Sequence, residues 1–106
     1  MKTKEEINRL KQAVKIMDLL ARMGIKPNRR VGVQLAYKSP LTNENSASFM
    51  VDDKKNVFND FSSGQKGDVI AFIMAIRKCS FYDAIDELES TQETSLSSFY
   101  LMKYHF

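Results

Sequence analysis

Two segments, Ser39-Pro-Leu-Thr-Asn-Glu-Asn-Ser-Ala-Ser-Phe49 and Val57-Phe-Asn-Asp-Phe-Ser-Ser-Gly-Gln-Lys-Gly-Asp-Val-Ile-Ala-Phe72, carry the pattern from which the rest of this chain can be interpreted. Ser39 and Thr42 flank one dipeptide, Asp60 and Ser63 flank another, and seventeen residues separate the two pairs. This is the layout of a structural zinc site with two knuckles and a short hairpin between them, but spacing alone favours two unrelated turns, so the surrounding residues must decide. Zinc needs four deprotonated donors, which three hydroxyls and one carboxylate do not supply. We therefore expect no bound zinc and no other cofactor.

The residues around these four positions closely resemble the N-terminal zinc-binding domain of bacterial replicative primases and their relatives on plasmids and mobile elements. The resemblance rests on three features: Pro40, which directly follows the first ligand-like position Ser39, the Ala-Ser-Phe triplet at 47–49, and the helix start Gly67-Asp-Val-Ile70. It extends from about Ile16 to Glu89 without a gap through the two pairs. In that family Cys, His, Cys and Cys stand at positions 39, 42, 60 and 63. The resemblance therefore implies a zinc-ribbon fold from which all four ligands have been lost.

The hydrophobic pattern predicts an α+β domain: a small antiparallel sheet of zinc-ribbon type, flanked by an N-terminal helix and two C-terminal helices. A capping signature at Thr3 and apolar residues at helical spacing indicate one helix from about Lys4 to Met23, ended by Gly24. The alternation of Val31, Val33, Leu35 and Tyr37 indicates a half-buried strand. Residues 48–51 and 57–61 form a hairpin around the turn at 52–56.

The second half of the chain predicts two helices after a flexible crossing bracketed by Gly64 and Gly67. Asp68 is the expected N-cap of a helix over 69–76 that is buried nearly all round, and Ser80 with Asp83 begins the next. The inward face of that last helix is expected to hold four residues: Phe81, Ala84, Ile85 and Leu88.

We expect residues 1–89 to form the domain and residues 90–106 to form a polar linker and an aromatic tail. The tail packs back, precedes a further domain, or mediates self-association through its apolar side chains. The residues available for self-association are Phe99, Tyr100, Leu101, Tyr104 and Phe106.

Length and composition restrict the kinds of protein that this chain can be. At 106 residues and 43% apolar content the chain builds one modest core. It has no membrane-spanning run and no hydrophobic signal core at its start, so a cytoplasmic location is the default. Cys79 is the only cysteine, which excludes an intrachain disulfide and a thiolate cluster and favours a buried thiol.

The net charge of +3 is unevenly distributed along the chain. Residues 1–30 hold nine Lys or Arg against three acids, residues 31–66 hold four of each, and residues 67–106 hold three bases against six acids. A basic N-terminal segment suits a phosphate backbone, but for an isolated basic helix a solvated face is the more common explanation.

Enzyme classes find little support in the sequence. The only histidine, His105, stands next to the end of the chain, so a nucleophile would lack a base. The stretch Gly64-Gln-Lys-Gly67 lacks the spacing of a nucleotide-binding loop. In the resembled family, primer synthesis belongs to a separate catalytic domain. Four carboxylate side chains lie close together in the sequence, and they are better explained as turn-forming residues than as a magnesium site: Glu44, Asp52, Asp53 and Asp60.

A nucleic-acid interface is the function that the resemblance implies, since family members recognise single-stranded template through basic and aromatic residues of the exposed sheet. The matching residues here are Lys38, Lys54, Lys55, Phe58, Lys66, Arg29 and Arg30. Phe58 and Phe61 have opposite parity along the strand, so one of them points away from the core side. The alternative for the aromatic residues is that they belong to the core.

The preferred interpretation is a non-catalytic DNA-binding module in replication or in mobilisation of a genetic element. Its expected partners are single-stranded DNA and a primase catalytic domain or a helicase, with no membrane contact. The alternative is a protein-interaction module that kept the fold without metal or DNA binding, using the acidic last helix and the aromatic tail.

Overall fold

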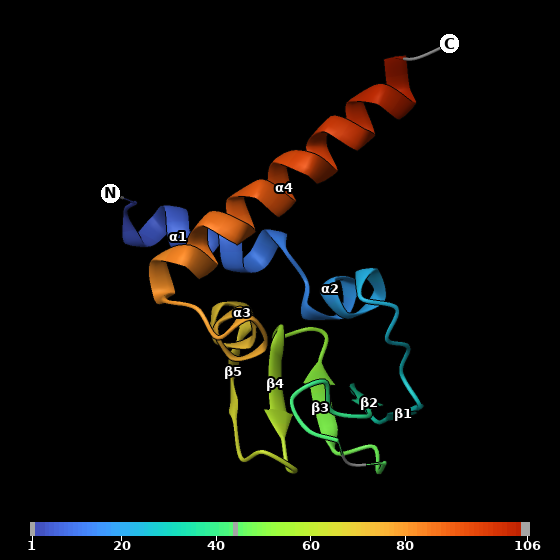
Figure 1. The fold of residues 1–106 in the computed structure, drawn as a ribbon. Helices are drawn as coiled ribbons and strands as arrows, with labels where there is room; N and C mark the ends of the chain where they lie inside the picture. The colour runs from blue at the N-terminus through green and yellow to red at the C-terminus, as the bar shows by residue number, and fades with distance from the viewer. Residues whose placement is uncertain (1, 44, 105–106) are drawn as a thin grey trace.

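The computed structural model describes residues 2–43 and 45–104, with the backbone alone described over 93–104. The fold is α+β: a five-stranded antiparallel sheet in the order β1-β2-β3-β4-β5, with four helices in the described part. Figure 1 shows α1, α3 and the start of α4 gathered on one side of the molecule, while the strands lie together at the other. The elements are α1 (Lys4–Ala13), α2 (Ile16–Arg22), β1 (Arg29–Val31), β2 (Gln34–Tyr37), β3 (Phe49–Asp52), β4 (Val57–Asp60), β5 (Lys66–Asp68), α3 (Val69–Arg77) and α4 (Phe81–Tyr104).

The N-terminal helix is broken into two, so the single helix predicted from Lys4 to Met23 is wrong. Val14 and Lys15 are extended, and Asn56 from the β3–β4 turn caps both new ends. Its amide nitrogen donates to the carbonyls of Lys11 and Val14, both at 2.8 Å, and its amide oxygen accepts from the Ile16 N–H at 2.9 Å. A side chain forty positions away thus satisfies backbone groups that a continuous helix would have paired internally.

The strand predicted from Val31 to Tyr37 is instead a hairpin of β1 and β2. Val31 pairs with Gln34, leaving Gly32 and Val33 as a two-residue turn. Gly32 has φ 61°, as the first central residue of a type II′ hairpin turn requires. Val31 and Val33 are therefore 46% and 55% exposed rather than half-buried, because the turn interrupts the alternation of faces.

The predicted crossing between Gly64 and Gly67 is partly a fifth strand. β5 pairs antiparallel with β4, setting Gly67 opposite Phe58. Gly67 has φ 154°, and a Cβ built there would lie 2.5 Å from the Cβ of Ala71 in the first turn of α3. Glycine is required at this position because strand and helix approach so closely.

The core lies between the sheet and α2, α3 and the first turns of α4. Phe49 and Phe58 stack with ring centroids 5.1 Å apart, and Phe72 of α3 meets each of them edge-on at 5.8 Å. The predicted β3–β4 hairpin is confirmed. The predicted N-cap of α3 is also confirmed, since the Asp68 carboxylate accepts from the Ala71 N–H at 3.0 Å. Within α3, Val69, Ile70, Phe72 and Ile73 are buried, whereas Ala71, Met74 and Ile76 are only partly buried, so the helix is less enclosed than predicted. Cys79 is partly buried rather than enclosed.

α4 begins as predicted, because the Ser80 hydroxyl accepts from the Asp83 N–H at 3.1 Å. Ala84, Ile85 and Leu88 are buried, but Phe81 is 40% exposed and not part of the inward face. The helix also continues through 90–98, where a polar linker was expected, and Figure 1 shows its second half running away from the other elements. The boundary at residue 89 stays a prediction.

The apolar tail residues lie outside the described side chains: Phe99, Tyr100, Leu101, Tyr104 and Phe106. Within the described part, no helix combines the length and the apolarity needed to cross a membrane.

Candidate functional site

The two knuckles meet at the carboxylate of Asp60, which is 0% exposed. Its Oδ2 accepts hydrogen bonds from the hydroxyls of Ser39 at 2.5 Å and Ser63 at 2.7 Å. Its Oδ1 accepts from the hydroxyl of Ser62 at 2.7 Å and from the Ser62 N–H at 3.0 Å. Four donors therefore converge on one buried anion, which joins the loop after β2 to the loop after β4.

Thr42, the remaining position of the zinc-like pattern, contacts Asp60 indirectly, through Ser62. Its hydroxyl lies 2.8 Å from that of Ser62, which in turn donates to Asp60. The same hydroxyls also order the loop backbone: Ser39 accepts from the Leu41 N–H at 3.0 Å and Ser63 from the Gln65 N–H at 3.2 Å. We call Ser39, Thr42, Asp60, Ser62 and Ser63 the knuckle cluster.

The zinc-like pattern does not identify Ser62, because that pattern contains only the four ligand-like positions. An aspartate that accepts from the N–H two residues later is a common turn motif, and Asp60-Phe-Ser62 has its composition. That local signal would have found the residue.

The electrostatics of the cluster favour an ionised carboxylate. Burial alone would raise the pKa of Asp60, but hydrogen bonds from Ser39, Ser62 and Ser63 outweigh it and the pKa is lowered from its ordinary value. Charge-assisted hydrogen bonds of this kind are roughly twice as strong as neutral ones. The negative charge is thus held by donors of the knuckles themselves.

The knuckle cluster does not fit zinc. Both oxygens of Asp60 already accept hydroxyl hydrogens, and the other positions of the pattern carry neutral hydroxyls. Among the residues that the structure describes, no group of three or more His, Cys, Asp or Glu could hold a metal ion. Asp52, one of the four neighbouring carboxylates in the sequence, accepts from the backbone N–H groups of Lys54 and Lys55 at 3.0 Å and so forms the turn.

The outer face of the sheet, away from the core, contains most of the predicted cations. The register places one residue from each strand in a row across this face: Arg29, Ala36, Met50, Asn59 and Lys66. Arg29, Asn59 and Lys66 are exposed, Met50 is half-buried, and Ala36 is buried between its neighbours. The row therefore ends in a cation at each edge of the sheet.

An exposed aromatic residue stands beside this row. The Phe61 N–H donates to the Ser48 carbonyl at 3.0 Å, which extends the β3–β4 pairing by one residue and keeps Phe61 on the face of Asn59. Phe61 is 71% exposed. By the same alternation Lys38 follows Ala36 on this face, and it too is exposed.

Lys55 and Lys66 line one shallow hollow of about 570 Å³ on the sheet, together with Met50 and Asn59. Lys54 is exposed in the adjoining turn. Arg30 is also exposed but alternates with Arg29, so it faces the other side of the edge strand. The structure thus brings Arg29, Lys38, Lys55 and Lys66 to one face.

Phe58 does not belong to this surface, and its assignment as a nucleic-acid contact is corrected. It is 3% exposed and packs inside the aromatic core, because its parity matches the inward-facing Asp60. Tyr37 is likewise buried, at 1% exposed, and its pKa is raised by burial and by the nearby charges of Asp53 and Asp18. Phe61 is the residue that takes the outward place.

Comparison with known proteins supports the inherited shape. The structure superposes on that of the Aquifex aeolicus primase, solved with its zinc-binding and RNA polymerase domains, with a TM-score of 0.70 and 24% identity. The match covers 88% of this chain and 22% of that chain. At this identity the match speaks for the fold alone, which is that of a primase zinc-binding domain.

Relatives match at higher identity. The DNA primase of Helicobacter pylori (strain ATCC 700392 / 26695) is 34% identical over 85 residues, and that of Pasteurella multocida (strain Pm70) is 36% identical over 80 residues. These matches cover 80% and 69% of this chain but only 15% and 14% of the relatives, so the chain spans about a seventh of their length. The family model of the CHC2 zinc finger matches residues 2–102. The chain, despite the serine, threonine and aspartate in its knuckles, belongs to the CHC2 zinc finger family.

Proposed function

We propose that this chain is a non-catalytic module that binds single-stranded DNA on the outer face of its sheet, in replication or in mobilisation of a genetic element. The observation that carries the proposal is Phe61, a ring left 71% exposed on the same face as the cations by a fold that buries its other sheet aromatics. An exposed aromatic side chain costs free energy in water, and stacking with an unpaired base would recover it.

The arrangement suits single strands better than duplex DNA. Unpaired bases offer their faces for stacking, while the phosphates need cations within reach on either side. Phe61 offers one ring, and Lys38, Lys55 and Lys66 offer charges on the same face of the sheet, for phosphate contacts that carry no sequence information. We therefore expect binding that is weak, sensitive to salt and tolerant of sequence.

The proposed partners follow from the family. Relatives of this chain are primases, and the matched region is a small part of each. A module of this size would act beside a separate primase catalytic domain or a helicase, presenting template to it.

Charge reversal on the sheet tests the phosphate contacts. Lys54→Glu with Lys55→Glu should weaken binding of a labelled oligonucleotide alike for several sequences, and should reduce the slope of log affinity against log salt by about 1.4, at roughly 0.7 per lost contact. The matched control is Arg9→Glu with Lys78→Glu, which changes the net charge equally on the helical side. Equal loss in both variants would show that net charge, not this face, attracts DNA.

Removal of the ring tests the stacking. Phe61→Ala should weaken binding by about 1–3 kcal/mol without changing the salt slope. The matched control is Tyr82→Ala, which removes an aromatic ring that is 69% exposed on α4. Undetectable binding at low salt, or an unchanged affinity of Phe61→Ala, would leave the chain as a protein-interaction module instead.

A further inference from the structure

A groove runs between α1, α3 and the start of α4, on the helical side of the molecule. One part of it is a pocket of about 470 Å³ lined by Lys2, Glu6, Ile7, Phe81, Tyr82, Ile85, Asp86 and Glu89. A second hollow of about 550 Å³ shares Ile7 and Phe81 with the first and adds Lys4, Met74 and Ile70. The two hollows therefore adjoin at Ile7 and Phe81, the apolar residues that line both, and we treat them together as one groove.

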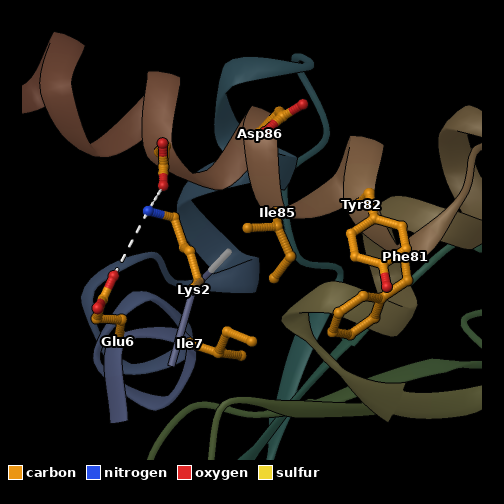
Figure 2. Close-up of a pocket in the computed structure, with 8 residues that line it drawn as sticks. Lys2, Glu6, Ile7, Phe81, Tyr82, Ile85 and Asp86 are labelled. Carbon is orange, nitrogen blue, oxygen red and sulfur yellow. Dashed lines mark ion pairs between the residues drawn. The ribbon is translucent and has the colours of Figure 1, made fainter. Parts of the chain in front are cut away.

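Two aromatic rings are left open at this groove. Phe81 and Tyr82 are 40% and 69% exposed, and their rings meet edge-on with centroids 5.8 Å apart. Figure 2 shows these rings at one end of the pocket, Lys2 with its ion pairs at the other, and Ile7 and Ile85 between them. Two adjacent exposed aromatic side chains over an apolar floor are typical of interfaces, where Phe and Tyr are enriched.

The charges at the two ends of the groove are opposite. At the pocket with Tyr82, Lys2 pairs with both Glu6 and Glu89, and Asp86 remains without an ion pair among the described residues. At the other hollow, Lys11 pairs with Asp68, and Lys4 is the cation left without a partner in the described part. An unpaired carboxylate and an unpaired ammonium thus flank the same apolar middle.

We propose that a second copy of this chain occupies the groove. A two-fold axis near Phe81 would set the Lys4 end of one copy against the Asp86 end of the other, because such an axis exchanges the two ends. Phe81 and Tyr82 of both copies would then cover each other in the middle, and two reciprocal Lys4–Asp86 pairs would fix the register. The same pattern would suit a foreign partner only if that partner reproduced both charges at this spacing.

Dimerisation and DNA binding would use different side chains, since none of the cations assigned to DNA binding, nor Phe61, lines the groove. The proposed dimer also differs from association through the aromatic tail, which would not involve Lys4 or Asp86. Binding through the outer sheet face, the groove or the aromatic tail can therefore be tested separately.

Sedimentation equilibrium of the full chain over a range of concentrations tests the proposal. We expect a monomer–dimer equilibrium in which Asp86→Lys raises the dissociation constant about tenfold, as does Lys4→Asp, because each change turns two attractions into two repulsions. The double variant Lys4→Asp with Asp86→Lys should restore the wild-type constant, since its pairs are reversed but again complementary. The matched controls, Lys26→Asp and Asp83→Lys, make the same charge changes outside the groove.

Phe81→Ser with Tyr82→Ser supplies a second route to the same answer. Both side chains are exposed, so the variant should keep the wild-type circular dichroism spectrum while losing the dimer. A wild-type protein that stays monomeric at every concentration would overturn the proposal. So would a dimer that survives the single charge reversals unchanged, or one that the double variant fails to rescue.

Discussion

Asp60 is a buried carboxylate with no cation among its described contacts, and such a group is costly unless hydrogen bonds satisfy it. Four donors do so, three of them hydroxyls that stand at or beside the ligand-like positions. Each bond to a charged group contributes about 1.5–3 kcal/mol, and part of this offsets the desolvation of the anion. The knuckle cluster therefore specifies how the two loops meet more than it stabilises the whole fold.

Replacement of Asp60 by asparagine tests this role. Asp60→Asn keeps the size but puts an amide group, itself a donor, against the donating hydroxyls, so urea unfolding should show a loss of about 3 kcal/mol. Ser62→Ala is the matched control: it removes one donor and leaves the carboxylate satisfied by the other three, with a loss of about 1.5 kcal/mol. A larger effect of Ser62→Ala than of Asp60→Asn would contradict the central place given to the carboxylate.

The pH dependence follows from the lowered pKa of Asp60. A carboxyl group whose pKa is lower in the folded state stabilises fully above its unfolded pKa of about 3.9, and this contribution disappears as the pH falls through the folded value. The difference in unfolding free energy between wild type and Asp60→Asn should therefore be constant near neutrality. It should shrink only below about pH 4. A difference that changes between pH 5 and 8 would require another titrating group.

At the scale of elements, Asn56 ties the β3–β4 hairpin to both N-terminal helices. Asn56→Gly should cost about 2–4 kcal/mol in the free energy of unfolding, because backbone groups at the end of α1 and the start of α2 lose their partners. Asn56 has φ 56°, so glycine removes the strain of that conformation as well. Lys78, with φ 53°, provides the control, since Lys78→Gly relieves the same strain without breaking a cap. An Asn56→Gly variant as stable as Lys78→Gly would show that the caps contribute nothing.

The elements that could be predicted are those whose signals are local. The β3–β4 hairpin, the N-cap at Asp68 and the start of α4 each depend on residues a few positions apart. The break between α1 and α2 depends on a side chain from another element, and no local pattern reports it. The β1–β2 turn was obscured because valines on both sides of Gly32 imitate a strand.

The residues of the candidate site likewise divide into those that could be predicted from the sequence and those that could not. The four ligand-like positions and most of the cations could be found from the sequence, since both follow from residue type and spacing. The sequence could not decide which of Phe58 and Phe61 is exposed. Their opposite parity places them on opposite faces of the strand, but it does not say which face packs against the helices. Packing against Phe49 and Phe72 decides it.

At the scale of the whole molecule, stability has to come from somewhere other than metal. Structural zinc contributes about 10–16 kcal/mol in a zinc-finger peptide, well above what the knuckle cluster can supply. The chain has a larger core than such a peptide, with Phe49, Phe72, Ile16 and Leu20 all below 2% exposed. Burial of such side chains is worth roughly 1.5–3 kcal/mol each, so about six of them match the contribution of the ion. The fold can therefore keep its shape after the ligands have gone.

The most direct test of this account is the thermal unfolding midpoint of the wild-type protein, measured in excess chelator and in a series of free zinc concentrations. We expect one midpoint throughout, because three neutral hydroxyls and a hydrogen-bonded carboxylate are poor ligands for zinc. The variant with Ser39→Cys, Thr42→His, Asp60→Cys and Ser63→Cys is the positive control: its melting temperature should rise with the logarithm of free zinc, since the loops already converge. A wild-type midpoint that falls in chelator, or that rises with zinc as the variant does, would contradict the claim that hydrogen bonds to Asp60 have taken the place of the metal.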